Sequence, residues 1–392
     1  MSAFKTDNNL TETGCPVCGS PQSESLYPQF SGTAVASNFM MVEQAVIDNR
    51  CCKSCGLIYN KEGTRRISDE FYKKAFKPKP TVKYYQEKAT VTRSDKALML
   101  LREMVDLRKF DGHLMDVGAG KGDFIVRFNQ NFPNWQVSAL EPNIGHKELH
   151  QKVPQVTVYP NSYNDIEPLP DYYDLMVSLS VLEHVPDPLA LLKWMWRGLK
   201  PNGALFIEVP NFENLPNDVF CIDHLTKFTL PTLENLAGAA SFQIHTLKAD
   251  GVPIYALLKK TDRQRELQNN FQVNSAIADK MCSISNNTIK AVARARQASR
   301  DSGEPFAIFG VTSAALIAPN LLNFSPSEIA AYIDENSNMW GQLLNDRPVG
   351  GIELIGEKKE KHIVLATSPV YFEIIEKKLK PTGVNVYKPE PV

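Results

Sequence analysis

A glycine-rich turn between two apolar segments constrains the fold of this chain more than any other feature. Residues 114–124 read Leu-Met-Asp-Val-Gly-Ala-Gly-Lys-Gly-Asp-Phe, and Glu141 ends a second apolar segment 25 residues after Asp116. A carboxylate that ends the strand following such a turn is placed to accept hydrogen bonds from the hydroxyls of a ribose. The pattern therefore predicts a strand, a tight turn, a helix and a second strand, arranged around a nucleoside site.

The three glycines of this turn, Gly118, Gly120 and Gly122, permit positive φ angles and leave room for a ligand against the backbone. The dinucleotide fingerprint requires G-x-G-x-x-G, because its third glycine lets the helix pack closely on the strand. The G-x-G-x-G spacing fits that fingerprint poorly. It resembles motif I of the class I S-adenosylmethionine-dependent methyltransferases, which implies that Asp116, Glu141 and these glycines bind the cofactor. The alternative is an ordinary strand-to-helix turn in another doubly wound domain.

The composition is that of a globular protein with two or three domains, since 392 residues are 43% hydrophobic and 22% charged. The net charge is −1 and there is no basic stripe, so extended nucleic acid is not an expected partner. No segment supplies the roughly 18 apolar residues of a membrane-spanning helix, and Met1–Asn9 does not resemble a signal peptide. We expect a cytoplasmic protein without a membrane partner. The oligomeric state is not indicated.

Five of the seven cysteines lie near the N-terminus and form two Cys-x-x-Cys-Gly motifs, Cys15/Cys18 and Cys52/Cys55. Four thiolates at this spacing can surround one zinc ion tetrahedrally. Disulfides are the alternative, but they are rare in cytosolic proteins. Cys51 could replace Cys52 as the third ligand. Because four protein ligands leave no open coordination position, we expect a structural zinc ion.

The hydrophobic pattern divides the chain into four parts. Residues 1–70 form the zinc-binding module, 71–260 the methyltransferase domain, 261–304 a helical linker of one or two helices, and 305–392 a small Rossmann-like α/β domain. Alternating strands and helices in the second part predict a doubly wound, parallel sheet. The strands expected there are Leu114–Val117, Gln136–Leu140, Leu175–Leu179 and Ala204–Val209, and helices are expected at Lys96–Leu107 and Leu189–Leu199.

The C-terminal part repeats the pattern of a strand, a glycine turn and a later acid. Gly310 follows an apolar segment, and Asp334 ends the segment Ile329–Ile333 24 residues later. This arrangement imitates a nucleotide-binding βαβ unit. A single glycine is weak evidence for a nucleotide site. The alternative is a Rossmann-like domain that binds no nucleotide and only packs against or positions the rest of the protein.

The resemblance to methyltransferases implies further cofactor residues. Ser162 and Tyr163 follow the third strand, where this class has its adenine contacts, and Ser178 and Leu179 would lie near the methionine part of the cofactor. Glu183-His184 opens the turn after the fourth strand. This pair recurs in enzymes with different substrates, so a structural role is favoured, with His184 retained as a catalytic candidate.

Asp223-His224 follows the segment Ala204–Val209 and its loop, so it should lie at the carboxyl edge of the sheet, where open α/β sheets bind ligands. A histidine beside a carboxylate can take a proton near neutral pH. We therefore expect His224 to be the general base and Asp223 to tune its imidazole. A helix cap or a buried, hydrogen-bonded histidine is the alternative.

The order of these parts resembles the sugar C-methyltransferases that act on nucleotide-linked deoxysugars. That family commonly has Tyr-His-Glu-His where this chain has Cys-Ile-Asp-His at residues 221–224. Its tyrosine- and serine-rich segment corresponds to residues 83–87, which keep Tyr84 and Tyr85 as possible orienting or acid groups.

This resemblance implies S-adenosylmethionine as cofactor and a small-molecule substrate, a carbohydrate or nucleotide-linked sugar. The acceptor atom can be carbon, oxygen or nitrogen, because half of the family's last motif is altered in this chain. Two other functions remain. One is a non-catalytic nucleotide- or partner-binding module whose catalytic loop has drifted. The other is an RNA-modifying methyltransferase, which the net charge of −1 disfavours.

Overall fold

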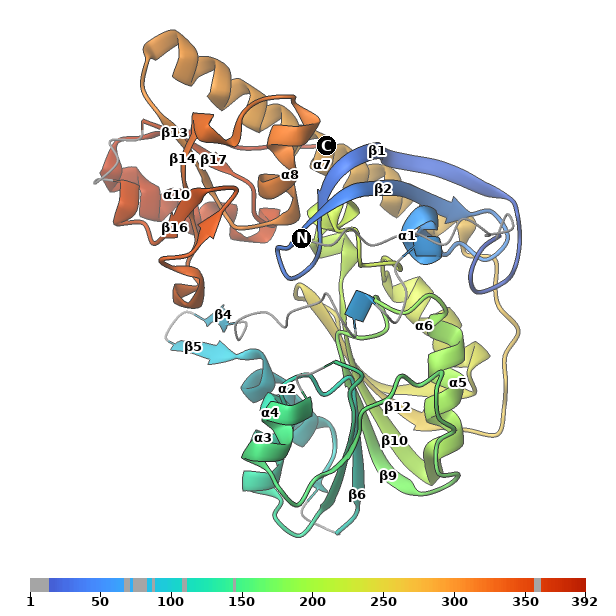
Figure 1. Ribbon diagram of the computed structural model, residues 1–392. Helices are drawn as coiled ribbons and strands as arrows, with labels where there is room; N and C mark the ends of the chain where they lie inside the picture. The colour runs from blue at the N-terminus through green and yellow to red at the C-terminus, as the bar shows by residue number, and fades with distance from the viewer. Residues whose placement is uncertain are drawn as a thin grey trace.

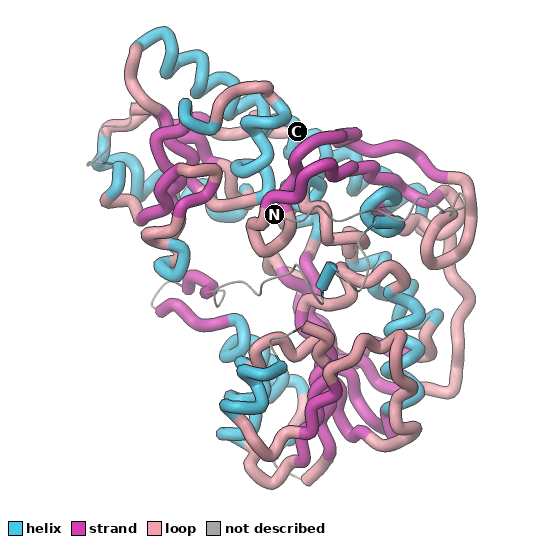
Figure 2. The backbone as a smooth tube through the Cα atoms, in the orientation of Figure 1, coloured by secondary structure: helices cyan, strands magenta, loops and turns pink. Residues whose placement is uncertain are grey.

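The computed structural model describes residues 14–66, 71–72, 83–86, 89–107, 111–143, 146–355 and 361–392 (Figures 1 and 2). Its α-helices are α1 (Lys61–Arg66), α2 (Arg93–Met104), α3 (Asp123–Asn131), α4 (His146–Lys152), α5 (Pro188–Gly198), α6 (Leu230–Ala239), α7 (Phe271–Ser302), α8 (Ser313–Leu321) and α10 (Phe372–Leu379).

The strands of the described residues fall into four sheets. They are β1 (Ser23–Val35), β2 (Met41–Cys52), β3 (Ile58–Asn60), β4 (Lys83–Gln86), β5 (Ala89–Thr92), β6 (His113–Val117), β7 (Gln136–Leu140), β8 (Thr157–Tyr159), β9 (Tyr173–Leu179), β10 (Leu199–Pro210), β11 (Phe242–Lys248), β12 (Pro253–Lys260), β13 (Phe306–Phe309), β14 (Ile329–Ile333), β15 (Leu343–Leu344), β16 (Arg347–Gly350), β17 (His362–Leu365) and β18 (Asn385–Tyr387).

The central sheet confirms the predicted doubly wound architecture. Its strand order is β11-β12-β10-β9-β6-β7-β8, and β12 runs antiparallel to both neighbours while the other pairs are parallel. The four predicted strands correspond to β6, β7, β9 and β10. The last begins earlier than expected, because Leu199 pairs with Tyr173 ahead of a register shift.

Helices cover both faces of this sheet, with α2, α3 and α4 on one side and α5 and α6 on the other (Figure 1). Successive strand residues point to opposite faces, so a strand covered on both sides is apolar throughout. In β6, Leu114 packs in the core with α2 and α3, whereas its neighbour Met115 packs in the core with α5 and α6. This alternation explains the unbroken apolar segments of the sequence.

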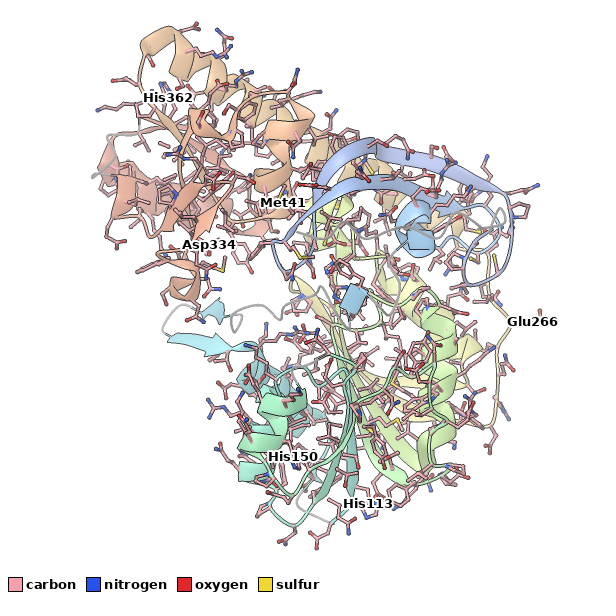
Figure 3. The ribbon with its side chains drawn as sticks, viewed as in Figure 1. Met41, His113, His150, Glu266, Asp334 and His362 are labelled. Carbon is pink, nitrogen blue, oxygen red and sulfur yellow. The ribbon has the colours of Figure 1, made fainter. Side chains whose placement is uncertain are left out.

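The order of the strands reverses between β6 and β9. Ligands of open α/β sheets bind in the crevice at the carboxyl ends of the strands at such a point. His113 begins β6 and lies at the opposite end of the sheet from Met41, at the start of β2 (Figure 3). The N-terminal sheet therefore lies toward the end of the central sheet where a ligand is expected.

The N-terminal sheet is antiparallel, with the order β1-β2-β3, and it joins the loop that follows β10. Val35 forms a parallel bridge with Cys221, and Tyr59 forms an antiparallel bridge with Thr226. The segment predicted as a zinc-binding module therefore pairs directly with the segment that contains His224.

Within the predicted linker 261–304, residues 261–270 are not helical and α7 (Phe271–Ser302) follows. It leads to a six-stranded sheet of order β15-β16-β14-β13-β17-β18 (Figure 1). All its pairs are parallel except β15–β16. One hydrophobic cluster contains residues of β1, β2, the 212–225 loop, α7, β13 and α8, so these parts share a core. Among the described residues, no helix is both long and apolar enough to cross a membrane.

Candidate active site

The glycine turn after β6 has the conformation that its sequence predicts. The φ angles of Gly118, Gly120 and Gly122 are 78°, 55° and 76°. A Cβ on Gly118 would lie 2.4 Å from Val181, and one on Gly122 would lie 2.3 Å from Leu149, so both positions also require close packing. A Cβ on Gly120 would meet none of the described residues within 4 Å. The described part of the chain therefore leaves the backbone of Gly120 uncovered.

Glu141 fixes this turn from the end of β7. Its Oε2 accepts a hydrogen bond of 2.6 Å from the Gly120 N–H, and its Oε1 accepts one of 2.7 Å from the Asn143 N–H. Burial raises the pKa of Glu141. Asp116, at the end of β6, is also buried, and its pKa is raised to about 7 by burial and by Glu141, against the influence of Arg93. Two buried carboxyl groups thus lie beside the turn.

A cavity of about 590 Å³ opens at the switch point and reaches from Glu141 to His224. This volume is within the usual range for small-molecule sites. Seven of the predicted cofactor residues line it, namely Asp116, Gly118, Gly120, Glu141, Ser162, Tyr163 and Leu179. Gly122 and Ser178 do not line it.

Ser178 is fully buried, and its hydroxyl has no hydrogen-bond partner among the described residues. The serine that lines the cavity is Ser180, which has a φ angle of 52°. Its Oγ donates to Glu208 Oε1 at 3.1 Å. Arg93 Nε lies 2.8 Å from the same Glu208 oxygen, and both residues line the cavity. Sequence analysis missed these three residues. No motif joins Arg93, at the start of α2, to Glu208, near the end of β10, and Ser180 follows directly after β9.

His224 lies in the loop between β10 and α6, which contains the short 3-10 helices η3 (Phe212–Asn214) and η4 (Pro216–Phe220). His224 Nδ1 is 2.5 Å from Asp218 Oδ1. Burial opposes a charged imidazole, but the Asp218 carboxylate outweighs it and holds the pKa of His224 well above its usual value. With Nδ1 engaged, Nε2 is the ring nitrogen left for a molecule in the cavity.

Asp218 stays ionised in spite of its burial. His224 and Lys227 outweigh the effect of burial and lower the pKa of Asp218 to about 2. Lys227 is itself buried, and its Nζ donates to the carbonyl oxygens of Asp218 (2.7 Å), Cys221 (3.2 Å) and His224 (2.8 Å). One ammonium group therefore holds three carbonyl groups of the loop together. Sequence analysis missed Asp218 and Lys227, although both lie within six residues of His224.

Asp223, the carboxylate expected to tune His224, makes its direct hydrogen bonds elsewhere. Its oxygens accept from the Ser37 N–H at 2.6 Å and the Ser37 hydroxyl at 2.8 Å, and Cys221 Sγ lies 3.2 Å away. Asp223 therefore connects the loop between β10 and α6 to the turn between β1 and β2 of the N-terminal sheet. The carboxylate in hydrogen-bonding contact with the imidazole belongs to Asp218.

His184 lines the cavity beside His224, and their ring centroids are 4.8 Å apart. His184 Nδ1 lies 2.9 Å from the Asp223 carbonyl oxygen and 3.0 Å from the Tyr72 hydroxyl. The backbone of Tyr84 and Tyr85 forms β4. Their side chains, which sequence analysis proposed as orienting or acid groups, lie outside the described part of the structure.

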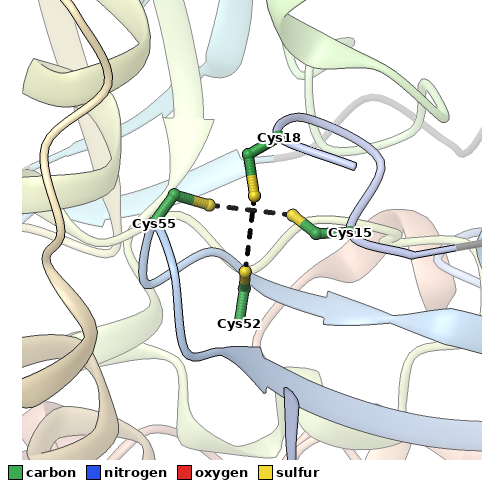
Figure 4. A group of neighbouring side chains, drawn as sticks. All are labelled: Cys15, Cys18, Cys52 and Cys55. Atoms are coloured by element: carbon green, nitrogen blue, oxygen red, sulfur yellow. Dashed lines mark hydrogen bonds between the residues drawn. The ribbon is translucent and has the colours of Figure 1, made fainter. Parts of the chain in front are cut away.

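The four predicted metal ligands come together at the N-terminal knuckles (Figure 4). The sulfur atoms of Cys15, Cys18, Cys52 and Cys55 all lie within 4.8 Å of one another. The distances are 3.7 Å for Cys15–Cys55 and 3.5 Å for Cys18–Cys52, close to the spacing of thiolates about 2.3 Å from a tetrahedral zinc ion. Cys51 instead packs in the core shared with α7, and its thiol is directed to the Gly56 carbonyl oxygen.

Comparison with known proteins identifies the central domain. Residues 85–247 match a methyltransferase domain family. A trans-aconitate 2-methyltransferase of Deinococcus radiodurans is 30% identical over 99 residues, which are 25% of this chain and 37% of that protein. A ubiquinone biosynthesis O-methyltransferase of Pseudomonas savastanoi is 36% identical over 107 residues, 25% of this chain and 44% of that protein. This chain thus spans less than half the length of either relative.

Among solved structures, a putative S-adenosylmethionine-dependent methyltransferase from Listeria monocytogenes has a TM-score of 0.38 and 14% identity, covering 43% of this chain and all of that one. A putative sarcosine dimethylglycine methyltransferase from Galdieria sulphuraria has a TM-score of 0.40 and 16% identity, covering 47% and 94%. The family match and the strand order carry the assignment. The chain contains a class I S-adenosylmethionine-dependent methyltransferase domain.

Proposed function

We propose that this protein transfers a methyl group from S-adenosylmethionine to a small-molecule acceptor. The observation that carries the proposal is that the glycine turn, Glu141 and His224 line one and the same cavity. S-adenosylmethionine would supply the methyl group. Gly120 offers an open backbone surface and Glu141 a carboxylate for a ribose, so the residues present suit this cofactor. The named activities of the curated relatives, on aconitate and on ubiquinone precursors, support a small acceptor.

The acceptor end contains His224, which we propose as the general base. Asp218 orients the ring through Nδ1 and stabilises the imidazolium that forms when Nε2 accepts a proton. We propose a carbohydrate or nucleotide-linked sugar as the acceptor, in line with the order of the four parts of the chain. The four cysteines would hold a structural zinc ion, because four thiolates leave no position for a substrate.

The proposal is tested by calorimetry with S-adenosylhomocysteine and by an acceptor panel. Nucleotide-linked ketosugars, hydroxylated sugars and unsaturated tricarboxylates are incubated with the cofactor, and S-adenosylhomocysteine is quantified. Exchange of carbon-bound hydrogen with deuterated solvent would separate methylation at carbon from methylation at oxygen. A wild-type protein that fails to bind S-adenosylhomocysteine would reject the function.

A further inference from the structure

The C-terminal sheet, formed by β13 to β18, has the strand order of nucleotide-binding α/β folds. Its order β16-β14-β13-β17-β18 reverses between β13 and β17, and open α/β sheets bind ligands at the carboxyl ends of the strands at such a point. Asp334, directly after β14, accepts hydrogen bonds of 2.8 Å from the N–H groups of Val311 and Asn336. Glu141 fixes the glycine turn of the central sheet in the same way. The two sheets thus have the same arrangement at the edge where a ligand is expected.

In the C-terminal sheet this edge is bound by the chain itself. The carbonyl oxygen of Ala366, which follows β17, accepts from Thr312 Oγ1 at 2.7 Å and from Asn217 Nδ2 at 3.2 Å. Ser368 Oγ donates to the carbonyl oxygen of Asn214 at 2.6 Å. The side chains of Ser368 and Asn217 are both buried. The edge that holds a nucleotide in other doubly wound folds therefore holds the loop between β10 and α6, to which Asn214 and Asn217 belong.

These contacts come immediately before Asp218 in the chain. Asn217 precedes it, and Pro216 begins the 3-10 helix η4 that contains it. Ser285 of α7, which is fully buried, donates to the Pro216 carbonyl oxygen at 2.6 Å. The C-terminal sheet and α7 thus both form hydrogen bonds with the segment directly ahead of the acid that contacts His224.

Lys227, by contrast, connects the loop to itself. Its Nζ donates to the carbonyl oxygens of Asp218, Cys221 and His224, which all belong to this loop. Lys227 therefore sets the shape of the loop, whereas contacts with other elements set where the loop lies. The N-terminal sheet holds the second half of the loop through Ser37, in the turn between β1 and β2. The C-terminal sheet and α7 hold its first half.

We propose that the C-terminal sheet positions the Asp218–His224 pair against the cavity, with Ser368 as the positioning residue, and uses for this the edge at which such sheets bind nucleotides. The inference rests on the proposed role of His224 as the general base. None of the described residues that line the cavity belongs to the C-terminal sheet, so Ser368 acts through the loop. A displacement of about 1 Å in a reacting group can lower turnover by about 10²-fold. The C-terminal sheet is thus required for turnover through its hold on the base.

The test compares the loss of these hydrogen bonds with the loss of a buried hydroxyl group elsewhere. Ser368→Ala, alone and combined with Ser285→Ala, should lower kcat by about tenfold, because the base is displaced from the acceptor. The affinity for S-adenosylhomocysteine should be unchanged, since the glycine turn keeps its contacts. Thr288→Val is the matched control and should keep the wild-type kcat. The buried Thr288 hydroxyl group donates within α7, to the Ile284 carbonyl oxygen.

A second measurement is independent of the reaction. The ring centroids of His184 and His224 are 4.8 Å apart, and His184 belongs to the turn after β9. NMR of histidine-labelled protein should show contact between the two rings in the wild type and in Thr288→Val. In the variant with both Ser368→Ala and Ser285→Ala this contact should weaken and the His224 ring signal should shift. Both measurements apply to Ser368→Ala alone if the double variant does not fold.

Two results would overturn the inference. One is a Ser368→Ala variant that melts at a lower temperature but keeps the wild-type ring signals and kcat, because the hydrogen bond would then contribute to stability alone. The other is binding of uridine diphosphate that shifts the backbone NMR signals of Thr312 and Ser368, which would make this edge a nucleotide site. A wild-type protein that fails to bind S-adenosylhomocysteine would count against the proposed function alone, since the ring contact is measured without the cofactor.

Discussion

Asp218 Oδ1 lies 2.5 Å from His224 Nδ1, six residues away in the chain. Both groups are buried, and Lys227 lies 3.4 Å from the second oxygen of Asp218. The loop thus contains a negative charge between two positive ones, which stabilises all three in a place with little solvent. This arrangement orients the candidate base toward the cavity and defines which substitutions should affect turnover.

His224→Gln should lower turnover by about 10²–10⁴-fold without changing the affinity for S-adenosylhomocysteine, because the glycine turn and Glu141 are unaffected. Asp218→Asn should also lower turnover, since it removes the charge that stabilises the imidazolium. Asp223→Asn, which removes the negative charge beside Ser37, is the comparison and should cost less turnover. Turnover, calorimetry and melting are measured on the three variants. A stable and fully active His224→Gln protein would exclude the base assignment.

Lys227→Met should destabilise the loop between β10 and α6. Methionine fills a similar volume but leaves the carbonyl groups of Asp218, Cys221 and His224 without their donor. Each unsatisfied buried carbonyl costs about 1–3 kcal/mol, so the free energy of unfolding should fall by several times the effect of a surface substitution. Urea denaturation measures this loss, with exposed Lys377→Met as the control. Equal unfolding free energies for the two variants would contradict the structural role of Lys227.

Glu141→Ala should weaken binding of S-adenosylhomocysteine by about 1–3 kcal/mol, because it removes the carboxylate expected to bind the ribose. The substitution also removes the two hydrogen bonds by which Glu141 fixes the turn, those from the N–H groups of Gly120 and Asn143. Calorimetry measures the affinity. Glu148→Ala is the matched control, because the Glu148 side chain on α4 is half-exposed, and it should leave binding unchanged. An unaltered affinity in Glu141→Ala would remove Glu141 from the site.

Asp116→Asn should become more stable relative to the wild type as the pH rises. The pKa of Asp116 is raised from 3.8 to about 7 in the folded protein, mainly by burial, so folding favours the protonated form. The associated stability is fully present below about pH 4 and is lost as the pH rises through 7. Asparagine cannot ionise and avoids this loss. Melting temperatures of both proteins from pH 4 to 8 measure the effect, and a constant difference across this range would contradict the assigned pKa.

The purified protein should contain one zinc ion per chain, and Cys15→Ser or Cys55→Ser should abolish its binding and lower the melting temperature. Cys51→Ser should keep the metal, because Cys51 packs in a different core. Metal analysis and thermal unfolding distinguish the variants. The effect should extend beyond the N-terminal sheet, since Asn274 of α7 donates to the Gly56 carbonyl at the second knuckle. A zinc-free wild type with a normal melting curve would favour free thiols.

The sequence alone determined the features that depend on local pattern. Apolar segments predicted four strands of the central sheet, because a strand covered on both faces must be apolar throughout. Of the apolar segments, Gln136–Leu140 and Ile329–Ile333 have the bounds of β7 and β14. The place of Gly118 in the turn and of Glu141 at the end of the next strand could be predicted, because the glycine turn and the following acid have a fixed spacing in the chain. The two cysteine pairs could also be predicted, because the turn within each Cys-x-x-Cys motif brings its two sulfur atoms close together.

Tertiary structure decided which side chains meet. Cys52 and not Cys51 faces the other cysteines, because adjacent residues of β2 point to opposite faces. Arg93 reaches Glu208 from a different element, and Ser37 reaches Asp223 across 186 residues. Asp218 lies six residues before His224, but the sequence pattern favours Asp223, the carboxylate adjacent in the chain. Only the fold of the loop around Lys227 directs one acid to His224 and the other to the N-terminal sheet, since burial requires each charge to have its own partner.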